Sequence, residues 1–446
     1  MLNGGIFRRL GVPSPSVAPS VVLFGECGED LLRSTSYVYT LVTDLGEESG
    51  FSPPSKGVDI YVGQKATISG MSASAPANIV ITKVRIYRAE TDNYGEAMFQ
   101  FVGEVSPGAS FTDADTEAHE VGNMKLWLEP PSTIASMCLA ANGIMAAIHG
   151  NGGDRREVCL SEPGVPYAFP QRFRVKLPHP ATHIFSVGAA IVVLTDERPC
   201  LIYAASPESA QITPLPKPAA GVSLFPQGGA ASQFGLIYPS HDGLVRVTEG
   251  GEVMVISTRT FTRDGWLGEM SPERMLVAVH DDRIFYFLHG DTPQGQGNVQ
   301  GGIFDAETGV FVALEDITPR IRSLYVDHVS DALYVLHGSE NSPAVMKQMC
   351  AADADVLTAR WESGVFEFPR AVGFSAFRIR GDFNPATQYA KITVRNERGE
   401  EYTTTVTEEG IYRLPSRLYT GLTYSIETNA VISGLEIASS SSELLV

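Results

Sequence analysis

Residues 277–287 read Val-Ala-Val-His-Asp-Asp-Arg-Ile-Phe-Tyr-Phe, two apolar runs joined by a short polar turn. Most of the apolar residues are β-branched or aromatic, and the turn contains two consecutive aspartates, which is typical of a β-hairpin. Residues 324–335 repeat this texture, with Leu-Tyr-Val before a polar turn and Ala-Leu-Tyr-Val after it. The two stretches therefore predict paired antiparallel strands.

Hairpins of this kind recur between about residue 132 and residue 352, and their starts lie roughly 40 to 50 residues apart, a spacing typical of β-propeller blades. The hairpin regions are 137–160, 183–204, 234–256, 275–288 and 321–336. A blade can bury its faces only against its neighbours, so we expect the blades to close into a ring. We expect five blades, with four or six as alternatives. No Trp-Asp dipeptide occurs, so the common WD40 type is not indicated.

The flanking regions also read as β-structure, with no helical periodicity sustained over about 12 residues. Residues 1–20 are rich in Pro and Ser and predict an extended arm, whereas residues 21–126 hold short strands separated by turn signals, the pattern of a β-sandwich. Residues 127–355 form the predicted propeller, and residues 356–446 predict a second, jelly-roll-like β-sandwich. The predicted fold class is therefore all-β.

The composition excludes several classes of protein. The 446 residues carry 33 basic and 51 acidic side chains, a formal net charge of −18, which argues against a protein that clamps a nucleic-acid backbone. No apolar run approaches the length of about 18 residues that spans a bilayer. The first ten residues lack the apolar segment of a secretory signal, so we expect none. The five scattered cysteines include no Cys-x-x-Cys pair and predict free thiols in a reducing compartment.

Searches for catalytic and metal-binding motifs find none. The chain has no His-Glu-x-x-His, no Gly-x-Ser-x-Gly, no phosphate-binding loop and no metal-spaced Cys/His cluster. The acidic stretch 113–117 fails as a calcium loop, because Ala118 and Met124 stand where such a loop needs Gly and Glu. Six turn aspartates could in principle supply a glycosidase pair: Asp196, Asp242, Asp264, Asp282, Asp305 and Asp327. We expect no catalytic residue, no metal, no cofactor and no enzymatic activity.

Several motifs, taken in order, resemble one family. Residues 9–13 (Arg-Leu-Gly-Val-Pro) lead into the arm, residues 37–42 and 84–88 contribute strands, and residues 46–55 read Gly-Glu-Glu-Ser-Gly-Phe-Ser-Pro-Pro-Ser. This order resembles the fibronectin-type-III-like module of tailed-bacteriophage tail proteins. Residues 160–170 and 238–245 are similar to the propeller segments of these proteins, and residues 413–416, 435–438 and 443–444 resemble their C-terminal sandwich.

The resemblance implies a structural protein of the virion tail, akin to the nozzle of short-tailed phages and assembled in the host cytoplasm. It implies a homo-oligomer, expected to be a hexameric ring, that contacts the portal, the adaptor or other tail proteins, with tail fibres and the host envelope as further partners. DNA would pass through such a ring without specific binding. Two alternatives remain open: a receptor-binding or glycan-binding propeller protein at the tail tip, and a glycan-cleaving enzyme.

The N-terminal arm supplies the candidate interface residues. The arm is too short and too rich in Pro and Ser to form a core, yet it contains apolar side chains that need a partner. We therefore expect contact with another subunit, or with the ring above, through Ile6, Phe7, Leu10, Val12 and Pro13. We also expect the channel wall to be net negative, since DNA must leave without binding.

Overall fold

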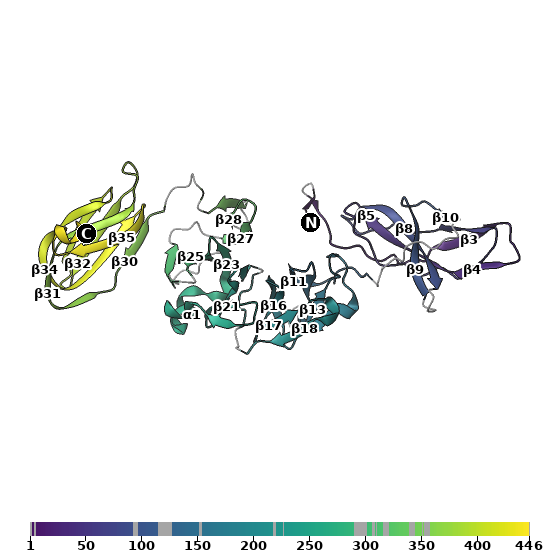
Figure 1. The fold of residues 1–446 in the computed structure, drawn as a ribbon, viewed down its shortest axis with the longest axis horizontal. Helices are drawn as coiled ribbons and strands as arrows, with labels where there is room; N and C mark the ends of the chain where they lie inside the picture. The colour runs from purple at the N-terminus through teal and green to yellow at the C-terminus, as the bar shows by residue number, and fades with distance from the viewer. Residues whose placement is uncertain are drawn as a thin grey trace. The chain divides into compact units, whose positions relative to one another are not determined.

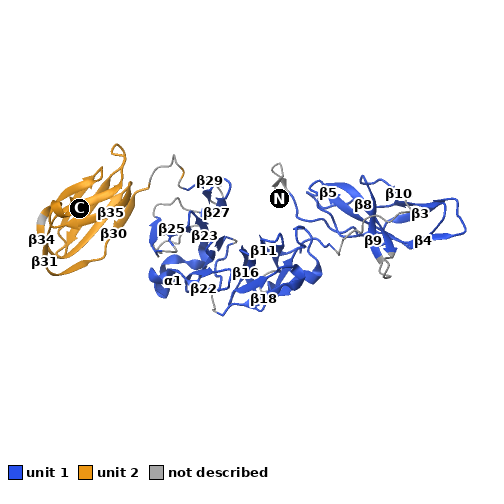
Figure 2. Cartoon of the chain, viewed as in Figure 1, with its two compact units in different colours: residues 1–349 blue, residues 350–446 orange. Residues whose placement is uncertain are grey.

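The structure is a computed structural model that divides the chain into two compact units, residues 1–349 and residues 350–446 (Figure 2). It describes residues 2–3, 6–91, 97–114, 127–150, 154–216, 220–225, 227–289, 301–305, 308, 310–314, 321–338, 344–349, 351 and 357–445. Antiparallel strands dominate both units, so the predicted all-β fold class is confirmed (Figure 1). The predicted boundaries at 126/127 and 355/356 fall at or within segments outside the described residues.

The first folded region of unit 1 is built from three small antiparallel sheets around one core. The sheets run in the orders β10-β7-β3, β5-β8-β9 and β4-β6. Tyr37, Tyr39 and Leu41 of β5, each at most 1 % exposed, pack with Ile68 and Ile86 in this core. The strands are β3 (Ser20–Gly25), β4 (Leu31–Thr35), β5 (Tyr37–Thr43), β6 (Val58–Tyr61), β7 (Gln64–Ser69), β8 (Ile81–Thr91), β9 (Ala97–Val105) and β10 (Phe111–Asp113).

A buried ion pair crosses this core. Arg88 of β8, whose side chain is 1 % exposed, donates from Nη1 to Asp113 Oδ2 at 2.8 Å, and the Asp113 side chain is 3 % exposed. The Tyr37 hydroxyl donates to the same carboxylate oxygen at 2.7 Å. Burial, together with the neighbouring carboxylate, raises the pKa of Tyr37 far above its usual range, so this phenol stays a donor.

The second region of unit 1 consists of five consecutive antiparallel sheets, in agreement with the predicted number of blades (Figure 1). The first four sheets have four strands each, and the fifth has three. The strands are β11 (Ile134–Leu139), β12 (Met145–His149), β13 (Glu157–Leu160), β14 (Arg174–Lys176), β15 (Ala181–Val187), β16 (Ala190–Thr195), β17 (Cys200–Tyr203), β18 (Gln211–Pro214), β19 (Ala230–Ser232), β20 (Gly235–Ser240), β21 (Gly243–Val247), β22 (Val253–Val255), β23 (Met275–His280), β24 (Arg283–Leu288), β25 (Gly301–Phe304), β26 (Phe311–Leu314), β27 (Ile321–Asp327), β28 (Ala332–His337) and β29 (Val345–Gln348).

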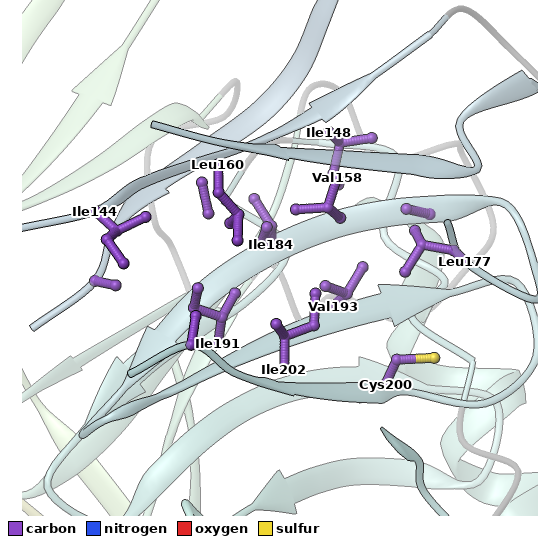
Figure 3. Close-up of a cluster of buried hydrophobic side chains, with 14 of the residues drawn as sticks. Ile144, Ile148, Val158, Leu160, Leu177, Ile184, Ile191, Val193, Cys200 and Ile202 are labelled. Carbon is purple, nitrogen blue, oxygen red and sulfur yellow. The ribbon is translucent and has the colours of Figure 1, made fainter. Parts of the chain in front are cut away.

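The blades stack through their faces, and a separate apolar cluster fills the space between each pair of neighbours. Figure 3 shows the cluster between the first two blades, where Ile148 and Val158 of the first face Ile184 and Val193 of the second. The first strands of successive blades lie next to one another in the order β11, β15, β19, β23, β27. Among the described strands, no comparable packing joins β27 to β11, so the expected closure of the ring is not observed.

Residues 277–287 fold as the predicted β-hairpin. Strands β23 and β24 pair with His280 opposite Arg283, which leaves Asp281 and Asp282 as a two-residue turn. Both aspartates have positive φ, 49° and 57°, as a type I′ hairpin turn requires. This turn matches the right-handed twist of the two strands and fixes their register.

One α-helix among the described residues departs from the sequence prediction. Helix α1 (Arg263–Met270) begins after Thr262, whose side chain accepts a hydrogen bond from the Gly265 N–H at 3.2 Å. Trp266 anchors it, because its indole N–H donates to the Ser240 carbonyl at 2.8 Å and the ring is 1 % exposed.

Within the described chain, no helix is long and apolar enough to cross a membrane. The 3-10 turns are η2 (Gln171–Phe173), η3 (Pro207–Ser209), η4 (Ser257–Arg259), η5 (Pro272–Arg274) and η6 (Ser441–Leu445).

Unit 2 is one antiparallel sheet that wraps around its own core, with the strand order β33-β32-β34-β31-β35 and β30 paired to β34. The long strands β31 and β34 are 17 and 19 residues long, and their pairing contains register shifts that allow them to bend. Phe377, Ile379 and Ile392 are the most deeply buried large side chains of its core. The strands are β30 (Ala359–Glu362), β31 (Phe366–Asp382), β32 (Ala390–Asn396), β33 (Glu401–Val406), β34 (Gly410–Thr428) and β35 (Val431–Ala438).

Candidate functional site

The arm is partly structured on its own chain. Strand β1 (Leu2–Asn3) pairs with β2 (Ile6–Phe7). Leu10 and Pro13 are partly buried, whereas Val12 is 2 % exposed and belongs to the core of the first sandwich. Val12 therefore contacts its own chain, which the sequence analysis did not foresee.

Two ion pairs fix the arm just before Val12. Arg8 pairs with Asp44 at 3.0 Å, and Arg9 pairs with Glu129 at 2.7 Å. These contacts place the chain from Arg8 onward against the sandwich and against the segment that leads into the first blade. Ile6 and Phe7 lie just upstream of these anchors, so the prediction of an intersubunit contact now concerns these two residues above all.

The stretch 46–55, one of the motifs in the family resemblance, covers one edge of strand β5. Ser49, Ser52 and Ser55 each use the backbone N–H to donate to a β5 carbonyl at 2.8 to 2.9 Å. Each serine hydroxyl also accepts a hydrogen bond from the N–H of the same β5 residue; the residues are Leu41, Tyr39 and Tyr37 respectively. The serines stand three residues apart, whereas the β5 residues to which they bond stand two residues apart. Each serine pairs both the N–H and the carbonyl of its β5 residue. We call this arrangement the serine ladder.

Glu48 connects the serine ladder with the first blade. Its carboxylate accepts hydrogen bonds from Thr40 Oγ1 at 2.6 Å and from the Tyr87 hydroxyl at 2.7 Å, and it pairs with Arg85 at 2.9 Å. Burial is the largest cause that raises the pKa of Tyr167, which lies beyond β13 in the first blade, and the Glu48 carboxylate is close enough to contribute to this raised pKa. The Tyr167 ring packs edge-on against Trp127 with centroids 6.1 Å apart. Trp127, which follows the sandwich in the sequence, therefore lies where the sandwich meets the first blade.

A loop that contacts four of the five blades is the main feature that the sequence analysis missed. We call residues 221–229, of which all but 226 are described, the hub loop. It precedes β19 and makes hydrogen bonds to four of the five blades. In blade 2, Phe225 O bonds to His183, and in blade 3, Val222 N bonds to Pro239. In blade 4, Leu224 N bonds to Glu273, Ser223 Oγ to Met275 and Gln227 O to Val277. In blade 5, the Gln227 side chain bonds to Ser323 and Leu324.

Glycines explain how the hub loop fits into this space. A Cβ at Gly228 would lie 2.2 Å from Ser223 Cβ, and a Cβ at Gly229 would lie 2.9 Å from the Phe185 ring. Real side chains do not tolerate such distances to neighbouring atoms. The sequence signal that was available is the long glycine-containing stretch between two hairpins, since most loops in compact domains have about 4 to 6 residues.

An open cavity of about 570 Å³ lies beside the hub loop. Thr182, Asp196, His241 and Glu273 contribute polar groups to its wall, and Leu267 of α1 contributes an apolar one. Only Asp196 of the six turn aspartates lines this cavity. Asp196, His241 and Glu273 are solvent-exposed, and no group of three or more potential metal ligands occurs among the described residues.

The remaining candidates from the sequence lie apart from one another. Asp242 pairs with Arg263 at 2.8 Å, and Asp282 accepts a hydrogen bond from Gln233 at 2.6 Å, so both act in local turn contacts. Asp113 is the buried partner of Arg88, and residues 115–117 of the acidic stretch lie outside the described residues. Four cysteines are described, and all four are free thiols: Cys27, Cys138, Cys159 and Cys200.

Comparisons with known proteins give only distant similarities. No family model and no curated protein matches the chain. Among solved structures, it is similar to the extracellular domain of a hybrid two-component system from B. thetaiotaomicron, with 11 % identity, 73 % of this chain and 45 % of the other covered, and a TM-score of 0.31. PorZ of Porphyromonas gingivalis gives 10 % identity, 64 % and 40 % coverage, and a TM-score of 0.26.

A third similar structure is the WD40 β-propeller domain of Doa1, with 11 % identity, 60 % and 90 % coverage, and a TM-score of 0.24. This chain spans less than half the length of the first two of these structures. TM-scores this low carry no argument about function.

Proposed function

We propose that this protein is a structural subunit of a bacteriophage tail, a nozzle-like component that assembles into a ring around the path of the ejected DNA. The proposal rests on the sequence resemblance. The observation that supports it most directly is the serine ladder. Residues 46–55, one of the motifs whose order carries that resemblance, pair along the edge of β5, and Glu48 among them lies near Tyr167 of the first blade.

The architecture is compatible with a scaffolding role. An assembly subunit needs rigid, broad surfaces, and antiparallel sheets stacked through apolar clusters supply them. Large apolar side chains are exposed on both units, as is common at subunit interfaces. Examples in unit 2 are Leu357, Trp361, Val365 and Leu418, which are 63 %, 53 %, 67 % and 71 % exposed.

The proposal is tested by locating the subunit. The purified full chain is examined by native mass spectrometry for its oligomeric state, and antibody-labelled virions are imaged by electron microscopy. We expect a closed ring, hexameric by the family resemblance, and label on the tail axis. A monomer or trimer with label at the tail periphery would instead support the receptor-binding alternative. Release of reducing sugar from host polysaccharide by the purified chain would support the enzyme alternative.

A further inference from the structure

The hub loop is held at Phe225 by two histidines from different blades. His183 of β15 in blade 2 donates from Nε2 to the Phe225 carbonyl oxygen at 2.6 Å, and the His183 side chain is buried. His289, which follows β24 in blade 4, stacks on the Phe225 ring with centroids 3.8 Å apart and planes 21° from parallel. One histidine thus holds the main chain of Phe225, and the other covers its side chain.

The hydrogen bond to Phe225 shows which ring nitrogen of His183 carries a hydrogen. A carbonyl oxygen can only accept, so Nε2 carries the hydrogen. Nδ1 is buried and has no hydrogen-bond partner, which fits the lone pair of a neutral ring but not a second N–H. A proton added at Nδ1 would create a buried N–H without an acceptor, beside the ring of Phe185 stacked at 6.2 Å.

The charged groups around the two histidines oppose protonation. Arg155, from the segment before β13 in blade 1, acts on His183, and Arg274 and Arg322, from blades 4 and 5, act on His289. Burial is the largest cause that lowers the pKa of each histidine, and these arginines lower it further; the hydrogen bond to the Phe225 carbonyl raises the pKa of His183 but does not reverse the shift. His337 is paired with Ile321, which also bridges to His289, and the Glu273 side chain is exposed.

We propose that the hub loop is a proton-operated latch between the blades, closed while His183 is neutral and released when His183 takes up a proton at its buried Nδ1. Because the loop bonds to blades 2, 3, 4 and 5, its release loosens the mutual positions of these blades. The inference goes beyond the proposed function and does not depend on it.

The direction of the pH effect follows from the lowered pKa values. The latch is fully stable above the ordinary histidine pKa of about 6.5. Below it, the open state binds protons more readily than the closed state, so the stability of the latch falls as the pH falls.

Hydrogen–deuterium exchange of the full chain tests the latch. Protection of the Leu224 and Val277 amides is compared at about pH 7.5 and about pH 5.5 after correction for the intrinsic exchange rate. We expect a several-fold loss of protection at the lower pH in the wild type. In the variant H183Q, whose amide can still donate to Phe225 O but which has no titratable group, we expect no pH-dependent loss.

The control variant is H241Q, which alters an exposed histidine and should respond to pH as the wild type does. If H183Q does not fold, as judged by its melting curve at neutral pH, the variant R155Q is used; it removes the cation that opposes protonation of His183 and should show a reduced response. Unchanged protection of the wild type at both pH values, or a variant response equal to that of the wild type, overturns the proposal.

Discussion

At the scale of single residues, the buried Arg88–Asp113 pair makes a sharp prediction. Replacing Arg88 by Ala leaves the Asp113 carboxylate and the Tyr37 hydroxyl in the core without the cation that compensates the charge. Breaking a buried pair by removal of one partner costs about 3–5 kcal/mol. We expect the calorimetric transition of the first sandwich to move to a markedly lower temperature in R88A.

The matched control for R88A is K83A. Lys83 pairs with Glu104 on the surface of the same sandwich, with side chains 50 % and 37 % exposed. Such an exposed pair contributes about 0–1 kcal/mol, so K83A should leave the transition nearly unchanged. Equal effects of the two substitutions would contradict the assignment of Arg88 to a buried, charge-compensating role.

Individual residues also show where sequence reasoning stops. The Asp281–Asp282 turn was predictable, because two aspartates between β-branched and aromatic runs encode a local conformation. The partner of Arg88 was not predictable, since Asp113 lies 25 residues away and the sequence shows only an acidic turn. Val12 was recognised as an apolar residue in need of a partner, but the sequence could not say that its own sandwich supplies one.

At the scale of elements, the serine ladder should stabilise the edge of β5. In S52A, the Tyr39 amide loses its acceptor Ser52 Oγ, although the backbone hydrogen bond to the Tyr39 carbonyl remains. A hydrogen bond of this kind contributes about 1 kcal/mol. We expect S52A to lower the unfolding free energy of the sandwich by roughly that amount. The triple variant S49A/S52A/S55A should lower the unfolding free energy by about three times as much as S52A does.

Chemical denaturation measures these differences, and S106A serves as the control because Ser106 is exposed in a turn. A triple variant as stable as S106A would show that the hydroxyls contribute nothing and that the backbone pairing alone holds the segment. A loss much larger than the sum of the single variants would indicate that the three serines act cooperatively.

Elements made of local contacts were foreseen better than elements made of distant ones. The blade hairpins follow from alternating apolar residues within about a dozen positions, and all five appear as paired strands. The hub loop has no such periodicity, because its partners are spread from His183 to Leu324. Helix α1 was missed for a related reason: it has only eight residues, and Trp266 and its other tertiary contacts decide its conformation.

At the scale of the whole molecule, the net charge of −18 predicts weak interaction with DNA. Binding to duplex DNA at physiological salt depends on lysine and arginine side chains that displace counterions. We expect no retardation of duplex DNA by the purified full chain in gel-shift assays at about 150 mM salt, and no binding that appears as the salt is lowered to about 50 mM. Salt-sensitive retardation would contradict the expectation of a repulsive channel wall.

The arm provides the prediction that best separates folding from assembly. Deletion of residues 1–12 would remove Val12 from the sandwich core together with the Arg8–Asp44 and Arg9–Glu129 pairs, so a loss of assembly could reflect a damaged fold. Deletion of residues 1–7 keeps all three contacts and removes only the β1–β2 segment with Ile6 and Phe7.

We expect this shorter deletion to leave the melting temperature of the chain unchanged and to abolish or strongly weaken its oligomer in native mass spectrometry. The variant I6S/F7S, which keeps the length of the arm but not its apolar side chains, should behave in the same way. If both variants assemble as the wild type does, Ile6 and Phe7 make no intersubunit contact that matters, and the ring must be held through other surfaces of the two units.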